Sequence, residues 1–205
     1  MRIAMLGHRG VPARYSGIER HVEEIGARLA ARGHNVVVFC RTNGSRDRPE
    51  TYRGMSLAHL PAITTKHLET ITHTGLSTLR AMRGFDVVHF HAVGPGLLAP
   101  LPRYLSGARV VQTVHGFDAD RAKWGATARR VLQVAQHMSA RVPDATITVS
   151  RFLQDEYRRR YRRETIFIPH GVIQPEPRPA HEIMQRYDLR PGGYVLFVGR
   201  LVPEK

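Results

Sequence analysis

The sequence predicts an α/β domain built on a Rossmann-like, doubly wound parallel sheet. Short apolar runs alternate with helical patterns along most of the chain. Several of these runs are continuously apolar, which is typical of strands that are buried on both faces of a sheet. Residues 2–6, 18–29 and 36–40 form a strand–helix–strand unit, and its crossover places the two strands parallel in one sheet.

The first strand covers residues 2–6 and ends at Gly7, where polar residues begin. Apolar residues then recur every three or four positions over 18–29, which predicts a helix. Gly33 follows the last of them and is placed to end the helix in a left-handed conformation. The charged residues of this helix are expected on its outer face: Glu19, Arg20, Glu23, Glu24 and Arg28.

The same alternation continues as far as residue 168. A stripe that contains Leu68, Ile71 and Leu79 predicts a second helix over 68–82. The remaining segments complete a sheet with helices on both faces. Strands are expected at 86–90, 109–114, 145–149 and 165–168, and helices at 124–138 and 151–163.

The pattern breaks after residue 172. Three prolines within 175–179 fit neither a helix interior nor a central strand, and they indicate a semi-rigid linker. We expect a Rossmann-like N-terminal domain over 1–172 and a linker with a short helix over 173–190. Residues 191–205 are expected to begin a second domain, with its first strand at 194–198.

Composition narrows the class of protein. The chain carries 31 Lys and Arg against 17 Asp and Glu, a net charge of +14. That excess attracts polyanions such as nucleic acid, anionic lipid or phosphorylated metabolites without choosing among them. Cys40 is the only cysteine, so no intrachain disulfide can form, and no stretch resembles a membrane span or a signal peptide. These features predict a cytoplasmic protein.

A glycine-containing loop follows the first strand. Residues 7–17 lead into the N-terminus of a helix, where backbone N–H groups and the helix dipole favour a phosphate or a sugar hydroxyl. The loop matches neither the dinucleotide fingerprint nor a P-loop, because no G-x-x-x-x-G-K-[ST] occurs in the chain. On spacing alone, an ordinary strand–helix loop remains open.

Histidines stand at the ends of neighbouring strands. His89 and His91 share one face of their strand, because side chains alternate with period two, and His115 follows the next strand. Three imidazoles there would suit zinc, which gives one alternative function, a metal-dependent hydrolase. The competing interpretation treats His91 and its neighbours as hydrogen-bonding residues of a pocket that positions a sugar or acceptor. No H-E-x-x-H motif supports the hydrolase.

Six sequence blocks in order carry a resemblance to the family 4 glycosyltransferases, which have the two-domain GT-B fold. The chain is most similar to the bacterial branch that builds cell-surface and exopolysaccharides, including rhamnosyl-, mannosyl- and galactosyltransferase-like members. The blocks cover essentially the whole chain: the opening 41 residues, "TKHLETITHT", "DVVHFHAVGP", "TVHGFDADRAKWG", "IPHGV" and "YVLFVGRLVPEK".

The resemblance implies roles for individual residues. Gly17 matches a loop glycine that lies against the donor phosphate and sugar, an approach that needs no side chain. His115 matches a histidine beside the reacting sugar, and Asp118 lies in the same loop as a candidate for orienting the acceptor. Arg200 and Lys205 match the basic pair that grips the donor diphosphate, so no metal or other cofactor is expected.

Two positions depart from the family pattern. Ser16 stands where the first of two glycines is usual, which makes this part of the donor-binding loop less permissive. His170 replaces the asparagine of a Pro-Asn-Gly block near the cleft, so donor preference could shift. Neither departure removes a charge that the implied mechanism needs.

The implied function is transfer of a sugar from a nucleotide-sugar donor to a glycan or lipid-linked glycan, with retention of configuration. We expect the 205-residue chain alone to be inactive, because most donor contacts belong to the second domain. If the native chain ends at Lys205, a non-catalytic carbohydrate- or nucleotide-binding module is the alternative.

The segment 151–163 holds six arginines against two carboxylates. Its stripe of Leu153, Tyr157 and Tyr161 allows three interpretations of the helix. The first is a solvated face with the stripe packed on the sheet, and the second is docking to an anionic membrane. Nucleic-acid binding is the third, and we expect none because no recognised DNA or RNA module accompanies the charge.

Overall fold

A computed structural model describes residues 1–14, 16–42, 48–65, 68–117, 124–172, 174, 176 and 179–198. The chain divides into two compact units, Met1–His170 and Gly171–Lys205. The first unit contains the whole sheet. None of the helices in the described residues is long and apolar enough to cross a membrane.

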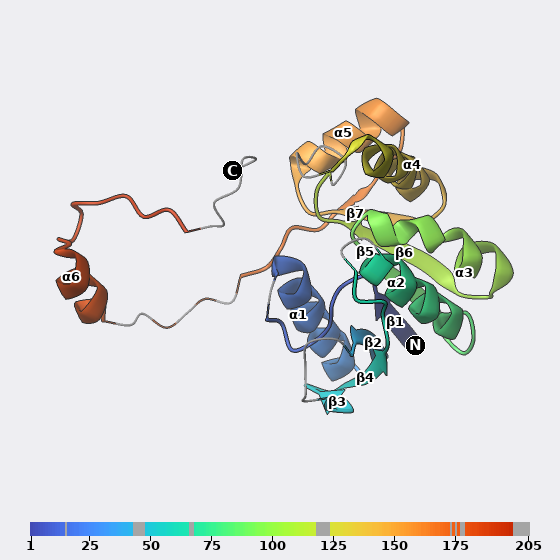
Figure 1. Ribbon diagram of the computed structural model, residues 1–205, viewed down its shortest axis with the longest axis horizontal. Coiled ribbons are helices and arrows are strands. Elements are labelled where there is room, and N and C mark those ends of the chain that lie inside the picture. The colour runs from blue at the N-terminus through green and yellow to red at the C-terminus, as the bar shows by residue number, and fades with distance from the viewer. Residues whose placement is uncertain are drawn as a thin grey trace. The chain divides into compact units, whose positions relative to one another are not determined.

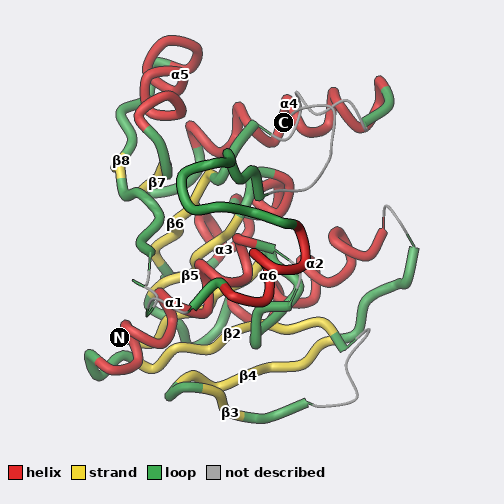
Figure 2. The backbone as a smooth tube through the Cα atoms, turned by 90° about the vertical axis from the view of Figure 1, so that its left-hand side faces the viewer, coloured by secondary structure: helices red, strands yellow, loops and turns green. Residues whose placement is uncertain are grey.

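The first unit is an eight-stranded sheet in the order β3-β4-β2-β1-β5-β6-β7-β8, whose strands lie side by side in Figure 2. Every neighbouring pair is parallel except the β3–β4 hairpin. This arrangement confirms the predicted Rossmann-like α/β fold. The strands are β1 (Arg2–Leu6), β2 (Asn35–Arg41), β3 (Thr51–Tyr52), β4 (Met55–Leu60), β5 (Val87–His91), β6 (Arg109–Val114), β7 (Ala145–Thr148) and β8 (Ile166–Phe167).

Helices cover both faces of this sheet, and α1 lies on the face opposite α2 and α3 (Figure 1). On the first face, Met5 and Val22 belong to one apolar cluster, and on the other Leu6 and Ala81 belong to a second. A third cluster joins β6 to α4 and α5 through Val114 and Tyr157. The helices are α1 (Gly17–Ala31), α2 (Leu68–Ala81), the 3-10 helix η1 (Gly94–Leu98), α3 (Pro100–Leu105), α4 (Ala126–Arg141) and α5 (Arg151–Tyr161).

Helix α2 forms where predicted but presents the opposite face to the sheet. The apolar side chains of Ile71 and Leu79 are 57% and 61% exposed, whereas Ser77 and Thr78 are fully buried. Small side chains let the helix approach the sheet closely, and the hydroxyl of Ser77 donates to the His73 carbonyl at 2.7 Å, which offsets part of the cost of burial. The apolar stripe is therefore left on the surface.

The prediction for α1 was wrong at two carboxylates. Glu19 and Glu23 were expected on the outer face, but they are only 3% and 2% exposed. Both lie beneath the loop that precedes the helix and accept hydrogen bonds from backbone N–H groups of that loop. The other end of α1 is as predicted, because Gly33 follows the C-cap with a φ of +83°.

The second unit holds one described helix, α6 (His181–Tyr187). The short helix expected within 173–190 is thus present. Residues 194–198, expected to be a strand, are exposed and unpaired. A strand needs a neighbour to pair its backbone groups, and the described residues of this unit supply none.

Candidate active site

Imidazoles gather at the carboxyl edge of the parallel sheet, where ligands bind in open α/β folds. His91 ends β5, His115 follows β6, and His170 follows β8. His21 reaches the same place from the second turn of α1. Four elements that are distant in the sequence therefore supply this group, which we call the histidine cluster: His21, His91, His115 and His170.

The members of the cluster are in mutual contact. The ring centroid of His21 lies 4.9 Å from that of His115 and 5.7 Å from that of His91. His91 and His115 are 5.8 Å apart, and one ring nitrogen from each of these three residues lies within 4.8 Å of the other two. The three imidazoles thus point into one small volume.

His170 links two members of the cluster. Its Nδ1 lies 3.0 Å from Nδ1 of His21, and its Nε2 lies 3.4 Å from Nδ1 of His115. The rings of His115 and His170 are also stacked, with 5.2 Å between centroids and 6° between planes. His170 therefore contacts Nδ1 of both His21 and His115.

Burial keeps the cluster uncharged near neutral pH. Burial, together with repulsion from neighbouring imidazoles, lowers the pKa of His115 to about 3 and that of His21 to about 4. His91 is fully buried, and burial holds its pKa well below the ordinary value. Neutral imidazoles carry one lone pair each, so the cluster can accept hydrogen bonds as well as donate them.

His89 does not join the metal-type trio that the sequence allowed. Its Nε2 lies 2.8 Å from the hydroxyl oxygen of Thr113 on the neighbouring strand. His89 is buried beside His91, with 4.2 Å between ring centroids, and burial lowers its pKa to about 3. The third imidazole near His91 and His115 comes from His21 instead, which the sequence did not single out.

The strand that carries His91 ends in a strained turn. Ala92 has a φ of +71°, a conformation that non-glycine residues rarely adopt. Two bonds to β6 hold it there: the Ala92 N–H donates to the Thr113 carbonyl at 3.0 Å, and the Gln112 amide donates to the Ala92 carbonyl at 3.0 Å. The sheet therefore fixes the position at which His91 enters the cluster.

Ser16 and Gly17 form the start of α1 beside this edge. Ser16 is the N-cap, and its hydroxyl accepts the Glu19 N–H at 3.4 Å. Gly17 is the first helical residue, and a Cβ added there would meet no atom within 4 Å among the described residues. The helix cap therefore explains the serine, which replaces the expected glycine. No contact among the described residues explains the glycine at position 17.

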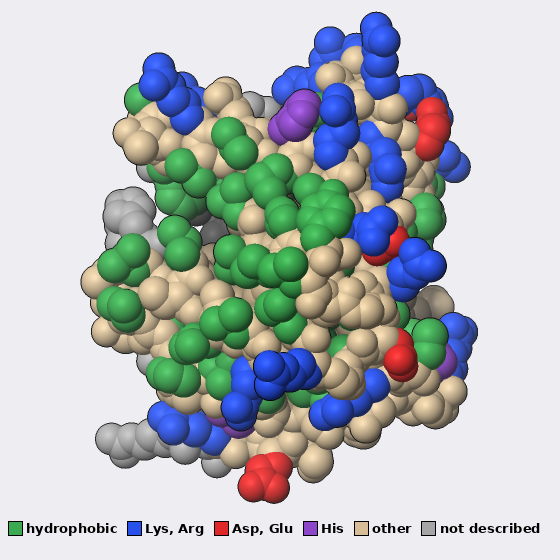
Figure 3. Space-filling view, turned by 90° about the vertical axis from the view of Figure 1, so that its right-hand side faces the viewer, with side chains coloured by type: hydrophobic (Ala, Val, Ile, Leu, Met, Phe, Trp, Pro, Cys, Tyr) green, Lys and Arg blue, Asp and Glu red, His purple; other side chains and the backbone are tan. Residues whose placement is uncertain are grey.

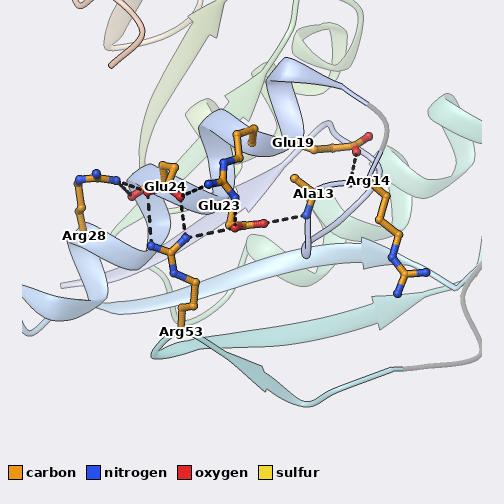
Figure 4. Close-up of polar contacts among 8 residues, drawn as sticks. Ala13, Arg14, Glu19, Glu23, Glu24, Arg28 and Arg53 are labelled. Atoms are coloured by element: carbon orange, nitrogen blue, oxygen red, sulfur yellow. Dashed lines mark hydrogen bonds and ion pairs between the residues drawn. The ribbon is translucent and has the colours of Figure 1, made fainter. Parts of the chain in front are cut away.

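Buried carboxylates hold the loop before α1 (Figure 4). The Ala13 N–H donates to Oε2 of Glu23 at 2.8 Å, and Arg53 donates to Oε1 of the same carboxylate at 3.2 Å. Arg53 also binds Glu24, and this contact holds the Glu24 pKa at about 2. We call this group the carboxylate network: Glu19, Glu23, Glu24, Arg20, Arg28 and Arg53. It ties the loop, α1 and the β3–β4 hairpin together.

Three residues that the sequence singled out lie outside the described residues: Asp118, Arg200 and Lys205. Two members of the cluster, His21 and His170, were not identified as neighbours of His115. His170 was noted only as a departure beyond a strand end. A signal for His21 exists, because it lies four residues after Gly17 and thus one helical turn further along the same face.

The glycosyltransferase family 4 model matches residues 15–173, which is most of the chain. The chain belongs to glycosyltransferase family 4. No curated protein sequence matches this family 4 chain.

Solved structures share the fold of this family 4 chain at low sequence identity. Sucrose-phosphate synthase from Thermosynechococcus elongatus matches with a TM-score of 0.68 and 19% identity, over 92% of this chain and 53% of that one. Anabaena HepE in complex with UDP and glucose gives 0.64 and 15%, over 92% and 50%. WaaG, a glycosyltransferase involved in lipopolysaccharide biosynthesis, gives 0.60 and 16%, over 93% and 52%. The chain thus spans about half the length of each of these relatives.

Proposed function

We propose that this chain forms the acceptor-side half of a GT-B glycosyltransferase. The enzyme would transfer a sugar from a nucleotide-sugar donor to a glycan or lipid-linked glycan, with retention of configuration. The observation that carries the proposal is the family match over residues 15–173, which includes the cluster around His115. HepE, a solved structure of similar fold, binds UDP and glucose, which supports a nucleotide-sugar donor here. Surface polysaccharide synthesis at the cytoplasmic side of a membrane is the proposed setting.

Gly17 is proposed to lie against the donor phosphate and sugar. Open space around its absent side chain and its place at a helix N-terminus both support this role. His115 is the proposed catalytic residue that positions the reacting sugar, and His91 is proposed to help position the sugar or the acceptor. Ser16 contributes to the same loop through its cap on α1.

The transfer step balances without a metal. The bond between the anomeric carbon and the diphosphate oxygen breaks, and the acceptor oxygen attacks from the same face. The departing diphosphate takes the acceptor proton and accumulates negative charge, which cations stabilise. Arg200 and Lys205 are proposed for that task, and Asp118 is proposed to orient the acceptor.

The proposed domain boundaries are 1–172 for the acceptor-side domain, 173–190 for the linker and 191–205 for the start of the donor-binding domain. The chain would therefore hold one complete wall of the cleft. We expect no release of nucleoside diphosphate when the 205-residue chain is incubated with UDP-, GDP- or dTDP-sugars and a glycan acceptor. A chain extended by the donor-binding domain should release it. Turnover by the 205-residue chain would contradict this division of labour, and an inactive extended enzyme would contradict the transfer itself.

A membrane contact is proposed for the face that carries α2, α3 and α4, in place of α5 alone. Leu153 and Tyr157 of α5 are buried, so its stripe packs inward, while Arg158 and Arg159 pair with Glu164 and Glu156. By contrast, exposed apolar side chains gather across the face shown in Figure 3, with arginines along its margins. They include Ile71, Leu76, Leu79, Tyr104, Leu105, Val131 and Val134.

Apolar side chains bordered by arginines suit an anionic lipid surface. We expect the protein to sediment with vesicles of anionic phospholipid and not with neutral ones. The double substitution Ile71→Ser and Leu79→Ser should reduce this binding, whereas Arg158→Ser on α5 should change it little. Equal binding by the double variant, or self-association that replaces lipid binding, would contradict a membrane role for this face.

A further inference from the structure

The histidine cluster contains buried nitrogens that the protein leaves without partners. Both ring nitrogens of His91, Nε2 of His21 and Nε2 of His115 are buried and accept or donate no hydrogen bond among the described residues. His91 is fully buried. A buried polar atom without a partner costs about 1–3 kcal/mol, so several in one place indicate a ligand that the free protein is built to receive.

We infer that His21, His91 and His115 form a binding site for a divalent transition metal, best matched by Zn²⁺. Imidazole nitrogen is a preferred ligand of zinc, and three protein ligands with a fourth open position is a common arrangement. One nitrogen from each residue already lies within 4.8 Å of the others. Zn–N bonds of about 2.0–2.1 Å require nitrogens about 3.4 Å apart, so small side-chain rotations close the site.

The two histidines that contact His170 restrict how the site is filled. A neutral imidazole has one donor and one acceptor nitrogen. His170 can therefore accept from Nδ1 of only one of its partners, His21 or His115, and must donate to the other. The partner that accepts carries its own proton on Nε2, which excludes that nitrogen as a ligand. Metal binding consequently breaks one of the two contacts, and the longer one, to His115 at 3.4 Å, is the weaker.

This geometry gives His170 a positioning role and not a ligand role. It retains the contact to His21 and fixes that ring, as outer-shell partners of metal ligands commonly do. His89 is excluded as a ligand through Nε2 by its contact with Thr113. The site thus differs from the trio expected from strand ends alone.

A metal at this position would withdraw His115 from the sugar, so zinc should inhibit the proposed transfer. That consequence rests on the proposed function, whereas metal binding itself does not. Binding is measured without turnover, so a failure of the metal site and a failure of the transferase proposal are seen in separate assays.

The test is equilibrium dialysis of untagged, chelator-treated protein against Zn²⁺ at pH 7.5. We expect one tightly bound ion per chain. His115→Ala and His21→Ala should each weaken binding by about 100-fold or more, because each removes one of three ligands and not only an outer-shell partner, whose loss costs about tenfold to 100-fold. Circular dichroism checks that each variant is folded, and half-buried His115 is the variant least expected to disturb the core.

Two matched controls separate this site from other histidines. His137 lies exposed on α4, outside the cluster, and His137→Ala should leave the affinity unchanged. His170→Ala removes an outer-shell contact to His21 and should weaken binding by about tenfold, less than the loss of a ligand. The inference is overturned if the wild type binds no stoichiometric zinc, or if His115→Ala and His137→Ala weaken binding equally.

Discussion

The carboxylate network and the histidine cluster share helix α1 but differ in how their polar groups are satisfied. In the network, Glu23 accepts from Ala13 and Arg53, and Glu24 binds Arg53 as well. In the cluster, His91 has no hydrogen-bond partner among the described residues. One region is complete in the free chain, and the other is complete only with a ligand.

The difference indicates that the carboxylate network has a structural role in this domain and that the histidine cluster has a binding role. The carboxylates fix the loop and the first turn of α1, and so fix the positions of Gly17 and His21. The imidazoles keep their lone pairs and N–H groups available at the expense of stability. Substitutions in the network should therefore lower stability, and substitutions in the cluster should mainly change binding.

Acidification should produce the largest effect, because it acts on several buried histidines together. The pKa of His8, His89 and His115 is lowered from 6.5 to about 3, principally by burial. The unfolded chain then binds more protons than the folded one, so stability is present above pH 6.5 and is lost as pH falls toward 3. Each histidine contributes about 1.4 kcal/mol per pH unit within that window. Urea midpoints at pH 7 and pH 5, measured with a chelator, test this, and equal midpoints would contradict it.

Glu23→Ala should be the most destabilising single change in the network. It leaves the Ala13 N–H without its acceptor and removes contacts to Arg20 and Arg53, which predicts a loss of about 2–3 kcal/mol. The matched control is Glu24→Ala, whose arginine partners are largely exposed, with an expected loss of about 1 kcal/mol or less. Chemical denaturation measures both. Similar losses would mean that the loop is not held through Glu23.

Ser16→Ala should cost about 1 kcal/mol, because it removes a helix N-cap. Ser150 caps α5 in the same way, accepting the Leu153 N–H at 3.2 Å, so Ser150→Ala is expected to cost a similar amount. Only the first change lies beside the proposed donor site. In the extended enzyme, Ser16→Ala should raise KM for the donor while Ser150→Ala leaves it unchanged. A raised KM in both variants would assign the effect to stability alone.

Gly17→Ala should have the smallest effect on stability, within about 0.5 kcal/mol, because the added methyl group meets no described atom. Sugar transfer by the extended enzyme should nevertheless fall, since the methyl group occupies the proposed path of the donor. Gly7→Ala is the contrasting control. It adds a Cβ 2.5 Å from the His91 carbonyl oxygen at a φ of +96°, and should destabilise the fold itself. Unimpaired transfer by Gly17→Ala would remove the donor role of Gly17.

The strands and most helices could be predicted because their apolar runs and spacings are strong local signals. The β3–β4 hairpin, η1 and α3 were not, since they are short and follow no sustained period. The orientation of α2 was not predicted either. Close packing of Ser77 and Thr78 against the sheet outweighed the cost of exposing Ile71 and Leu79. The spacing of apolar residues in a sequence does not show which face of a helix will pack against the sheet.

The site was predicted in part for a similar reason. His91 and His115 stand at strand ends, and topology alone brings such positions together. His21 and His170 enter the cluster through the packing of α1 and the path after β8, which a single sequence does not encode in its spacing. Glu23 was placed on the wrong face because helical period could not anticipate a loop that folds back over α1.

The central claim is that the cluster is a binding wall on which His115 positions a sugar. The most direct measurement is donor-dependent sugar transfer by the extended, two-domain enzyme, compared between the wild type and His115→Ala at equal folded fraction. We predict transfer by the wild type and a loss of about 100-fold or more in kcat for the variant, as expected when a positioning group is removed. Unchanged kcat in a folded His115→Ala enzyme would contradict the claim.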